Sequence, residues 1–368
     1  MQVFILSLGT RGDVELFLTL GRELARRGHR VRFAAAALYE ARIRDSGLLA
    51  VPLGGGTLEQ LQTLLSSLST VPQRERPRLF FERWVEPQLP LALHQIHRLT
   101  AEIDFFICNM KLGLRRAGRI IPGAAVTYDP PDSLEDLRRN REPEHRGRLI
   151  EIVALSKALI DPDGLWETDY HFTGFWDEPT SATWEPPADL LRFVQGDPPP
   201  VVLAMGSMVT FDTGRLAAVL DEALGRIGAR AIVVEGWSRF PSNNESTNRV
   251  YVANEIPYGW LFDKASCVIH HGGCGTLAAV LRAGRPSIVL PQLACQENFG
   301  KMLLREKLAA DILDFETLDA ARLADALTRA LNDEQIRQSV RAWQKIRAEE
   351  KGVAAAADLI ERHWQEIQ

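Results

Sequence analysis

The sequence predicts an α/β protein with two doubly wound, Rossmann-like domains. Residues 3–8 form a short apolar run, a glycine turn follows, and residues 13–28 have the apolar spacing of a helix before a second apolar run at 31–36. A strand, a crossover helix and a strand imply a parallel sheet. A second series of this kind begins at residue 201, and 368 residues suit two domains of about 150 residues better than one.

Composition indicates where the two domains divide. Residues 176–190 are rich in proline and lack periodicity, so we expect a linker between an N-terminal domain at 1–175 and a C-terminal domain at 191–353. The other predicted strands are 104–108 and 124–128 in the first domain, and 201–205, 230–234, 267–270 and 287–290 in the second, with helices at 213–227 and from about Thr276.

Composition and charge exclude several classes of protein. Apolar residues make up 46% of the chain and charged residues 25%, which argues against disorder. The formal charge of −5 gives no reason to expect nucleic acid as a partner, and four cysteines are no disulfide scaffold. No apolar run is long enough to span a membrane, and the first residues lack the features of a signal peptide. We therefore expect a cytoplasmic protein.

The most informative segment is a glycine-rich turn in the second domain. A predicted strand runs into His270 and His271, and three glycines in four positions then precede Thr276, which opens a predicted helix. Glycines allow a ligand to approach the backbone closely, and the free N–H groups and dipole of a helix N-terminus favour an anion. His271, Gly273, Gly275 and Thr276 are therefore candidates for binding a diphosphate.

This segment resembles the donor-binding signature of family 1 glycosyltransferases, in particular the bacterial sterol- and antibiotic-glycosylating members. The signature reads His-His-Gly-Gly-x-Gly-Thr, then Arg-Ala-Gly-x-Pro, and the resemblance extends over nearly the whole chain, from Gly-Thr-Arg-Gly-Asp-Val at the start. It implies a GT-B fold, in which two Rossmann-like domains face each other across a cleft. The N-terminal domain would bind a lipophilic acceptor and the C-terminal domain a UDP- or dTDP-sugar, and the final helix, 354–368, would cross back to the N-terminal domain.

The resemblance also assigns further residues to the donor and acceptor. It implies inversion at the anomeric carbon and no metal ion; the one Asp-x-Asp spacing, Asp161 and Asp163, lies in a proline-containing turn. The implied contacts are Gly206 and Ser207 for the diphosphate, Trp237, Ala253 and Asn254 for the nucleobase, and Met110, Tyr128 and Asp129 for the acceptor.

Asp13 follows the first predicted strand and has two interpretations. Aspartate is a good N-cap, so the residue can simply begin a helix. Members of the resembled family carry a general base at this turn, which implies that Asp13 takes the proton of the acceptor hydroxyl. A helix N-terminus lowers the pKa of a carboxyl and weakens it as a base, so proton transfer would be late or the acceptor acidic, such as a phenol.

Cys295 departs from the family pattern. The family has an acidic residue followed by glutamine, which bind the donor sugar, whereas here Cys295 precedes Gln296 and Glu297. A thiol is a weak hydrogen-bonding group, so a contact to a sugar hydroxyl is missing. Three interpretations stay open: the donor is a deoxysugar, Glu297 supplies the carboxylate, or transferase activity is lost.

The sequence therefore predicts an inverting, metal-independent glycosyltransferase, with a degenerate binding or partner subunit or a nucleotide-sugar epimerase as alternatives. The segment 74–84 mixes arginine with Phe80, Phe81 and Trp84. It is a candidate for peripheral membrane contact or for covering the acceptor, although an ordinary amphipathic helix has the same pattern. We expect a monomer or a homodimer.

Overall fold

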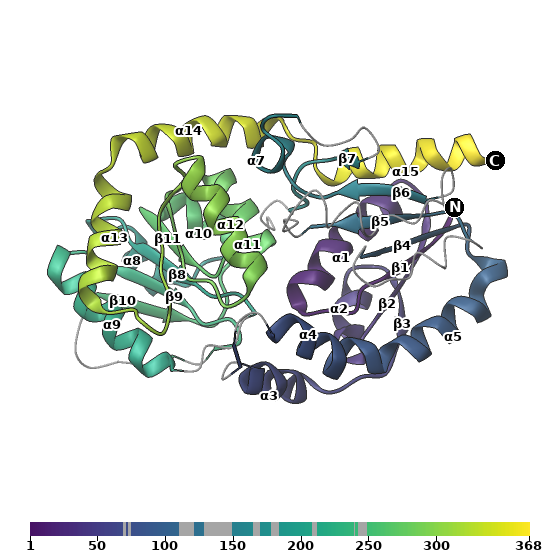
Figure 1. Ribbon diagram of the computed structural model, residues 1–368, viewed down its shortest axis with the longest axis horizontal. Helices are drawn as coiled ribbons and strands as arrows, with labels where there is room; N and C mark the ends of the chain where they lie inside the picture. The colour runs from purple at the N-terminus through teal and green to yellow at the C-terminus, as the bar shows by residue number, and fades with distance from the viewer. Residues whose placement is uncertain are drawn as a thin grey trace. The chain divides into compact units, whose positions relative to one another are not determined.

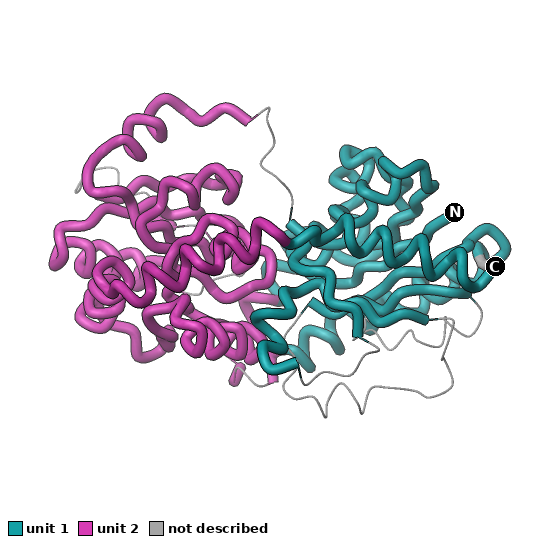
Figure 2. The backbone as a smooth tube through the Cα atoms, turned by 90° about the horizontal axis from the view of Figure 1, so that it is seen from above, with its two compact units in different colours: residues 1–64, 77–177, 350–368 teal, residues 65–76, 178–349 magenta. Residues whose placement is uncertain are grey.

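A computed structural model of the protein describes residues 1–68, 71–72, 75–109, 121–128, 149–164, 170–177, 184–207, 212–238, 240–241 and 249–368. The chain divides into two compact units, which Figure 2 distinguishes by colour. Unit 1 comprises Met1–Leu64, Pro77–Asp177 and Glu350–Gln368, and unit 2 comprises Leu65–Arg76 and Glu178–Glu349. The sequence pattern did not predict that the segment Leu65–Arg76 groups with unit 2.

Unit 1 is built on a parallel sheet with strand order β3-β2-β1-β4-β5-β6-β7 in the described part of the chain (Figure 1). Its strands are β1 (Gln2–Leu6), β2 (Arg30–Ala35), β3 (Leu49–Pro52), β4 (Phe105–Asn109), β5 (Gly123–Thr127), β6 (Leu149–Val153) and β7 (Tyr170–Phe172). The predicted first βαβ unit is present, because α1 (Arg11–Arg26) connects the parallel strands β1 and β2. A crossover of this kind places the ends of successive strands at the same edge of the sheet.

The other helices of unit 1 surround this sheet. They are α2 (Glu40–Asp45), α4 (Arg76–Phe80), α5 (Leu89–Leu99), α7 (Lys157–Ile160) and α15 (Val353–Ile367), with α3 (Leu58–Leu68) starting in unit 1, and the short turns η1 (Ala37–Tyr39), η2 (Phe81–Val85), η3 (Glu86–Gln88) and η4 (Thr100–Glu102). Trp176, inside the predicted linker, is buried, and its indole N–H donates to Thr173 Oγ1 at 2.9 Å. Part of the predicted linker, 178–183, lies outside the described residues.

Unit 2 has a second parallel sheet, with strand order β10-β9-β8-β11-β12-β13 among the described residues. Its strands are β8 (Val201–Ala204), β9 (Ala231–Val234), β10 (Val250–Ala253), β11 (Cys267–His270), β12 (Ser287–Val289) and β13 (Ala309–Ile312). Its helices are α8 (Ala188–Val194), α9 (Thr213–Ile227), α10 (Tyr258–Leu261), η8 (Phe262–Lys264), α11 (Cys274–Ala283), α12 (Ala294–Arg305), α13 (Ala320–Asn332) and α14 (Glu334–Glu349).

Helices cover both faces of this second sheet, as a doubly wound fold requires. Successive residues of a strand point to opposite faces. Val201 and Leu203 of β8 belong to the apolar cluster formed with α9 and α13, whereas Val202 and Ala204 belong to the cluster formed with α8, α10 and α11. The strands are therefore buried on both sides, which accounts for their continuous apolar sequences.

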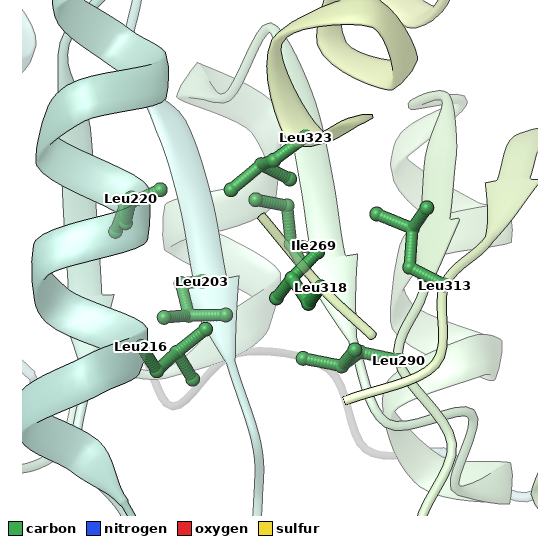
Figure 3. A pocket seen from close by; sticks show the side chains of 8 residues that line it. All are labelled: Leu203, Leu216, Leu220, Ile269, Leu290, Leu313, Leu318 and Leu323. Carbon is green, nitrogen blue, oxygen red and sulfur yellow. The ribbon is translucent and has the colours of Figure 1, made fainter. Parts of the chain in front are cut away.

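One small cavity lies within the first of these clusters, between the sheet and the helices α9 and α13 (Figure 3). Its volume is about 10 Å³, and only leucine and isoleucine side chains line it, among them Leu203, Leu216 and Leu323. A space of this size without polar groups holds neither a ligand nor a well-bound water. It is a packing gap, and the functional site has to be sought at the ends of the strands.

Arg27 attaches the last helix to unit 1, where α15 packs beside α1. Its guanidinium donates to Asp358 Oδ1 at 2.6 Å, to Glu361 Oε2 at 2.8 Å and to the carbonyl of Ala354 at 3.1 Å. The Arg27 side chain is 17% exposed, Glu361 29% and Asp358 54%, so the bond to Glu361 is better shielded from water than the bond to Asp358. The neighbouring Arg26 is 71% exposed, and it pairs with Glu23 on its own helix.

We expect Arg27→Ala to lower the free energy of unfolding of unit 1 by about 2 kcal/mol, because charged acceptors on α15 lose their donor. Arg26→Ala is the matched control and should change stability by less than about 0.5 kcal/mol. Denaturant unfolding measures the first quantity, and amide hydrogen exchange in α15 locates the change. Equal effects of the two substitutions would show that Arg27 does not attach the helix.

Candidate functional site

The predicted donor residues of unit 2 all follow neighbouring strands at the carboxyl edge of its sheet. Ala253 and Asn254 are at the end of β10, Trp237 follows β9, and Gly206 and Ser207 follow β8. The glycine-rich turn follows β11, and Cys295, Gln296 and Glu297 lie in α12 after β12. In open parallel sheets this edge is where ligands bind.

Backbone contacts join the first three of these turns. The N–H of Gly236 donates to the carbonyl of Asn254 at 3.2 Å, and the N–H of Trp237 donates to the carbonyl of Gly206 at 3.3 Å. Gly236 has a φ of 59°, and a Cβ placed there would lie 2.0 Å from the Gly206 oxygen. Only glycine fits this position. The candidate nucleobase residues are thus fixed directly beside the candidate diphosphate residues.

The turn after β8 also meets the turn after β11. A Cβ at Gly206 would lie 2.8 Å from Cε1 of His271, and Gly206 has a φ of 61°. A side chain at this position would therefore displace the imidazole as well as strain the backbone. The structure brings Gly206 and His271 together, as expected for two groups that bind the same diphosphate.

Helix α11 begins at Cys274, two residues earlier than the sequence pattern predicted, with Gly273 as its N-cap. Gly275 and Thr276 are therefore part of its first turn, where backbone N–H groups have no partner within the helix. No side chain caps this N-terminus, and a Cβ at Gly275 would meet no atom within 4 Å. The amide groups of the first turn of α11 border open space.

His270 and His271 have different roles. The N–H of Gly272 donates to His270 Nδ1 at 3.1 Å, so Nε2 carries the proton and donates to Ser287 Oγ at 3.1 Å. Both ring nitrogens of His270 are used inside the protein, and burial followed by the neighbouring His271 lowers its pKa to about 3. His270 therefore holds the turn in place.

His271 is buried as well, but its Nδ1 has no hydrogen-bond partner in the described part of the protein. Burial lowers its pKa to about 4, opposed by a hydrogen bond to the backbone of Ala204. The imidazole is therefore neutral at pH 7. Since the neutral ring has one proton, which the bond to Ala204 uses, Nδ1 is an acceptor, and it can donate to a ligand oxygen only when the ring is protonated.

Helix α12 differs from α11 because the protein caps it. Gln296 Oε1 accepts hydrogen bonds from the backbone N–H groups of Gln292 at 2.8 Å and Leu293 at 3.1 Å. Glu297 forms an ion pair with Lys301 at 2.8 Å, and Cys295 is half-buried in the first turn. Of the three predicted sugar-binding residues, Gln296 thus uses its oxygen for the fold and Glu297 has a charged neighbour.

Arg76 is a functional candidate that sequence reasoning missed. It donates to the carbonyl of Gln292 and to the carbonyl of Val71, both at 2.8 Å, and thereby connects the segment Leu65–Arg76 to the turn after β12. Burial lowers the pKa of its guanidinium. The only sequence signal was the arginine-rich stretch 74–84, whose partner lies 216 residues away.

Asp13 lies at the carboxyl edge of the sheet of unit 1, in the first turn of α1. The N-cap is Thr10 and Asp13 is the third residue of the helix, so the N-cap interpretation needs correction. Asp13 Oδ2 accepts hydrogen bonds from the Thr10 backbone N–H at 2.6 Å and from Thr10 Oγ1 at 3.0 Å. The carboxylate therefore completes a capping box and is held in a fixed orientation.

Tyr128 and Asn109 join Asp13 at this edge, from the ends of β5 and β4. The Tyr128 hydroxyl donates to Asp13 Oδ1 at 2.5 Å, and Asn109 Nδ2 donates to the Tyr128 oxygen at 2.5 Å. Tyr128 was predicted to contact the acceptor, and it lies in direct contact with the predicted base. The other two acceptor candidates, Met110 and Asp129, lie outside the described residues.

The residues that the structure describes contain no group of three or more histidine, cysteine, aspartate or glutamate side chains close enough together to hold a metal ion. None of their helices combines the length and the hydropathy needed to cross a bilayer.

Comparisons with known proteins agree with this arrangement. Residues 3–101 match the family described as glycosyltransferase family 28 N-terminal domain, and residues 218–361 match erythromycin biosynthesis protein CIII-like, C-terminal domain. A sterol 3-beta-glucosyltransferase of Arabidopsis thaliana is 24% identical, over 99% of this chain and 66% of the relative. A UDP-sugar-dependent glycosyltransferase of Dictyostelium discoideum is 25% identical, over 99% of this chain and 26% of the relative. The chain thus spans about two thirds of the first relative and about a quarter of the second.

Solved structures confirm the fold. The calicheamicin glycosyltransferase CalG4 superimposes with a TM-score of 0.74 at 18% identity, over 99% of this chain and 98% of that protein. Glycosyltransferase VinC, in complex with dTDP, superimposes with a TM-score of 0.70 at 16% identity, over 99% and 100%. The two parallel α/β units form a GT-B fold, as predicted. These matches to both parts of the chain confirm the family resemblance expected from the sequence, which is to GT-B glycosyltransferases of the sterol- and antibiotic-glycosylating kind.

The buried histidines predict how stability depends on pH. Unfolded histidines bind a proton near pH 6.5, whereas folded His270 and His271 do so near 3 and 4. Below pH 6.5 the unfolded state binds more protons, so the free energy of unfolding falls by about 1.4 kcal/mol per pH unit for each histidine down to about pH 4. Denaturant unfolding between pH 7 and 5 measures this slope. His271→Gln removes one of the two histidines, so the slope should fall by about 1.4 kcal/mol per pH unit. An unchanged slope would contradict the lowered pKa of His271.

Proposed function

We propose that this protein is an inverting glycosyltransferase that transfers a sugar from a UDP- or dTDP-sugar to a hydroxyl group of a lipophilic small molecule. The observation that carries the proposal is the N-terminus of α11, which has no side-chain cap, borders open space at Gly275 and lies beside the unsatisfied Nδ1 of His271. A nucleoside diphosphate would accept hydrogen bonds from the N–H groups of this first turn and, once His271 is protonated, from its Nδ1, and the helix dipole would stabilise its charge.

The named relatives support both parts of the substrate assignment. The Dictyostelium protein is named as UDP-sugar-dependent, and the VinC structure contains dTDP, so both nucleotides are candidates. Sterol glucosylation by the Arabidopsis relative supports a lipophilic acceptor. In this chain, Phe81, Leu91 and Leu93 are exposed around α4 and α5, which is consistent with an acceptor taken up from a membrane surface.

In the proposed reaction, Asp13 is the general base. The acceptor oxygen attacks the anomeric carbon from the face opposite the diphosphate while its proton passes to Asp13. The new carbon–oxygen bond forms as the bond to the diphosphate breaks, and the electron pair leaves with the nucleoside diphosphate. The N–H groups of α11 and His271 would stabilise the charge on this leaving group, so no metal ion is required for that task.

A protein with this fold that binds a nucleotide without transferring sugar is the second candidate function. It is favoured by the missing acid at Cys295 and by the use of Gln296 Oε1 as a helix cap. Both candidate functions predict nucleotide binding, but only the transferase predicts turnover of a nucleotide sugar.

We expect UDP or dTDP to raise the melting temperature of the wild-type protein, because a ligand that binds the folded state stabilises it. Asp13→Asn should lower the transfer rate by about 10²- to 10⁴-fold, since a general base is removed, while nucleotide affinity stays within about threefold. Transfer is measured with UDP-glucose and dTDP-glucose against a 3β-hydroxysterol and a simple phenol. Turnover that survives in Asp13→Asn would exclude Asp13 as the base, and no thermal shift with either nucleotide would contradict the donor site.

We further expect Cys295 to disfavour fully hydroxylated donors. The thiol cannot replace a carboxylate that accepts hydrogen bonds from a sugar hydroxyl, and such a bond is worth about 1.5–3 kcal/mol. Cys295→Asp should therefore raise kcat/KM for UDP-glucose by about tenfold and leave a deoxysugar donor unchanged or poorer. Cys295→Ser is the matched control, because it adds a hydroxyl without a charge. If Cys295→Asp changed kcat/KM equally for UDP-glucose and for the deoxysugar donor, Cys295 would not determine which donor is used.

A further inference from the structure

The hydrogen bonds of Asp13 determine which oxygen can take a proton. Oδ2 accepts two hydrogen bonds from Thr10, at 2.6 Å from the backbone N–H and 3.0 Å from the hydroxyl. A carboxylate oxygen offers two lone-pair positions, so Thr10 fills Oδ2. Thr10 thereby makes Oδ2 the poorer proton acceptor, and we take Oδ1, which the Tyr128 hydroxyl contacts at 2.5 Å, as the oxygen that receives the proton.

The surroundings hold Tyr128 in this position. Its side chain is buried, its oxygen accepts the hydrogen bond from Asn109 Nδ2, and its ring packs edge-on against Phe17, with 5.9 Å between ring centroids. Phe17 lies one helical turn after Asp13 on α1. The Tyr128 ring therefore packs on the same helix that carries Asp13. The Tyr128 hydroxyl cannot move away from Asp13 without disturbing the contacts with Phe17 and Asn109.

We propose that Tyr128 is a positioning residue that orients Oδ1 of Asp13 and sets its basicity; this inference rests on the proposed role of Asp13 as the base. A hydrogen bond from the tyrosine hydroxyl stabilises the charged carboxylate and so lowers its pKa. A carboxylate held in this way is ready to accept a proton but is a weaker base. Transfer is then favoured for acceptors whose hydroxyl loses its proton easily or late in the reaction.

The effect of Tyr128 on the basicity of Asp13 has to be distinguished from the effects of other titratable groups nearby. Tyr39 on η1 interacts with the charge of Asp13, and also with Arg11 and Glu15 of α1. Burial, followed by the charge of Asp13, raises the pKa of Tyr39, so its hydroxyl stays neutral. Its oxygen has no hydrogen-bond partner among the described residues. Tyr39 therefore provides a control tyrosine close to the same carboxylate.

The test compares the pH dependence of kcat/KM for transfer from UDP-glucose to a simple phenol. Tyr128→Phe keeps the ring and removes the donor, so the acidic limb should move to higher pH by about one unit, which is about a tenfold change in the ionisation constant. Asn109→Ala weakens the hold on the Tyr128 hydroxyl and should move the limb in the same direction by a smaller amount. Tyr39→Phe should leave it where it is. A purely structural role for Tyr128 would lower activity without displacing the limb, and that result would overturn the proposal.

A second measurement separates this inference from the proposed function. The pKa of Asp13 is read from the ¹³C signal of its carboxyl group, assigned by its absence in Asp13→Asn, in the wild type and in Tyr128→Phe. A pKa about one unit higher in Tyr128→Phe supports the role of Tyr128 even if no sugar is transferred. The same pKa in both proteins overturns it, whatever the activity.

Discussion

One carbonyl group, that of Gly206, determines how the candidate donor residues come together. The turn after β8 lies between the turns after β9 and β11, and it touches both. The carbonyl accepts the N–H of Trp237, and it lies so close to Gly236 that no side chain fits there. On the other side, the Cα of Gly206 borders the imidazole of His271. Because these contacts use backbone atoms, the nucleobase and diphosphate candidates keep a fixed spacing that side-chain motion does not alter.

Helix ends explain why an anion would bind at one turn and not at another. Three helices, α1, α11 and α12, begin just after strands of their sheets, and each presents unpaired N–H groups. Thr10 and Asp13 close the N-terminus of α1, and Gln296 closes that of α12. Only α11, among these three, starts at a glycine without a side-chain cap. The same strand-to-helix turn thus holds the protein's own carboxylate in unit 1 and remains open to a ligand in unit 2.

Local sequence patterns predicted the elements that carry their own boundary signals. Helix α9 has the predicted bounds, 213–227, because Asp212 caps its start and Gly228 ends it in the left-handed conformation. Strand β11 also has the predicted bounds, 267–270. The start of α11 was placed too late, since Gly273 and Gly275 resemble a loop although the first turn of a helix tolerates them. Strands such as β7, with three residues, and the half-exposed β10 lack the periodicity that identifies a strand.

The candidate sites were predictable as turns but not as hydrogen-bonded arrangements. The family resemblance indicated that Asp13 and Tyr128 belong near the acceptor, yet 115 residues separate them and nothing in either segment indicates their hydrogen bond. The same holds for His271: its sequence neighbours indicate a diphosphate-binding turn, but they do not indicate that burial makes the imidazole neutral. Binding an anion beside this imidazole would favour its protonated form, because an opposite charge raises the pKa that burial has lowered. Burial thus keeps His271 neutral, and a bound anion would raise its pKa again, with the proton taken up from solvent.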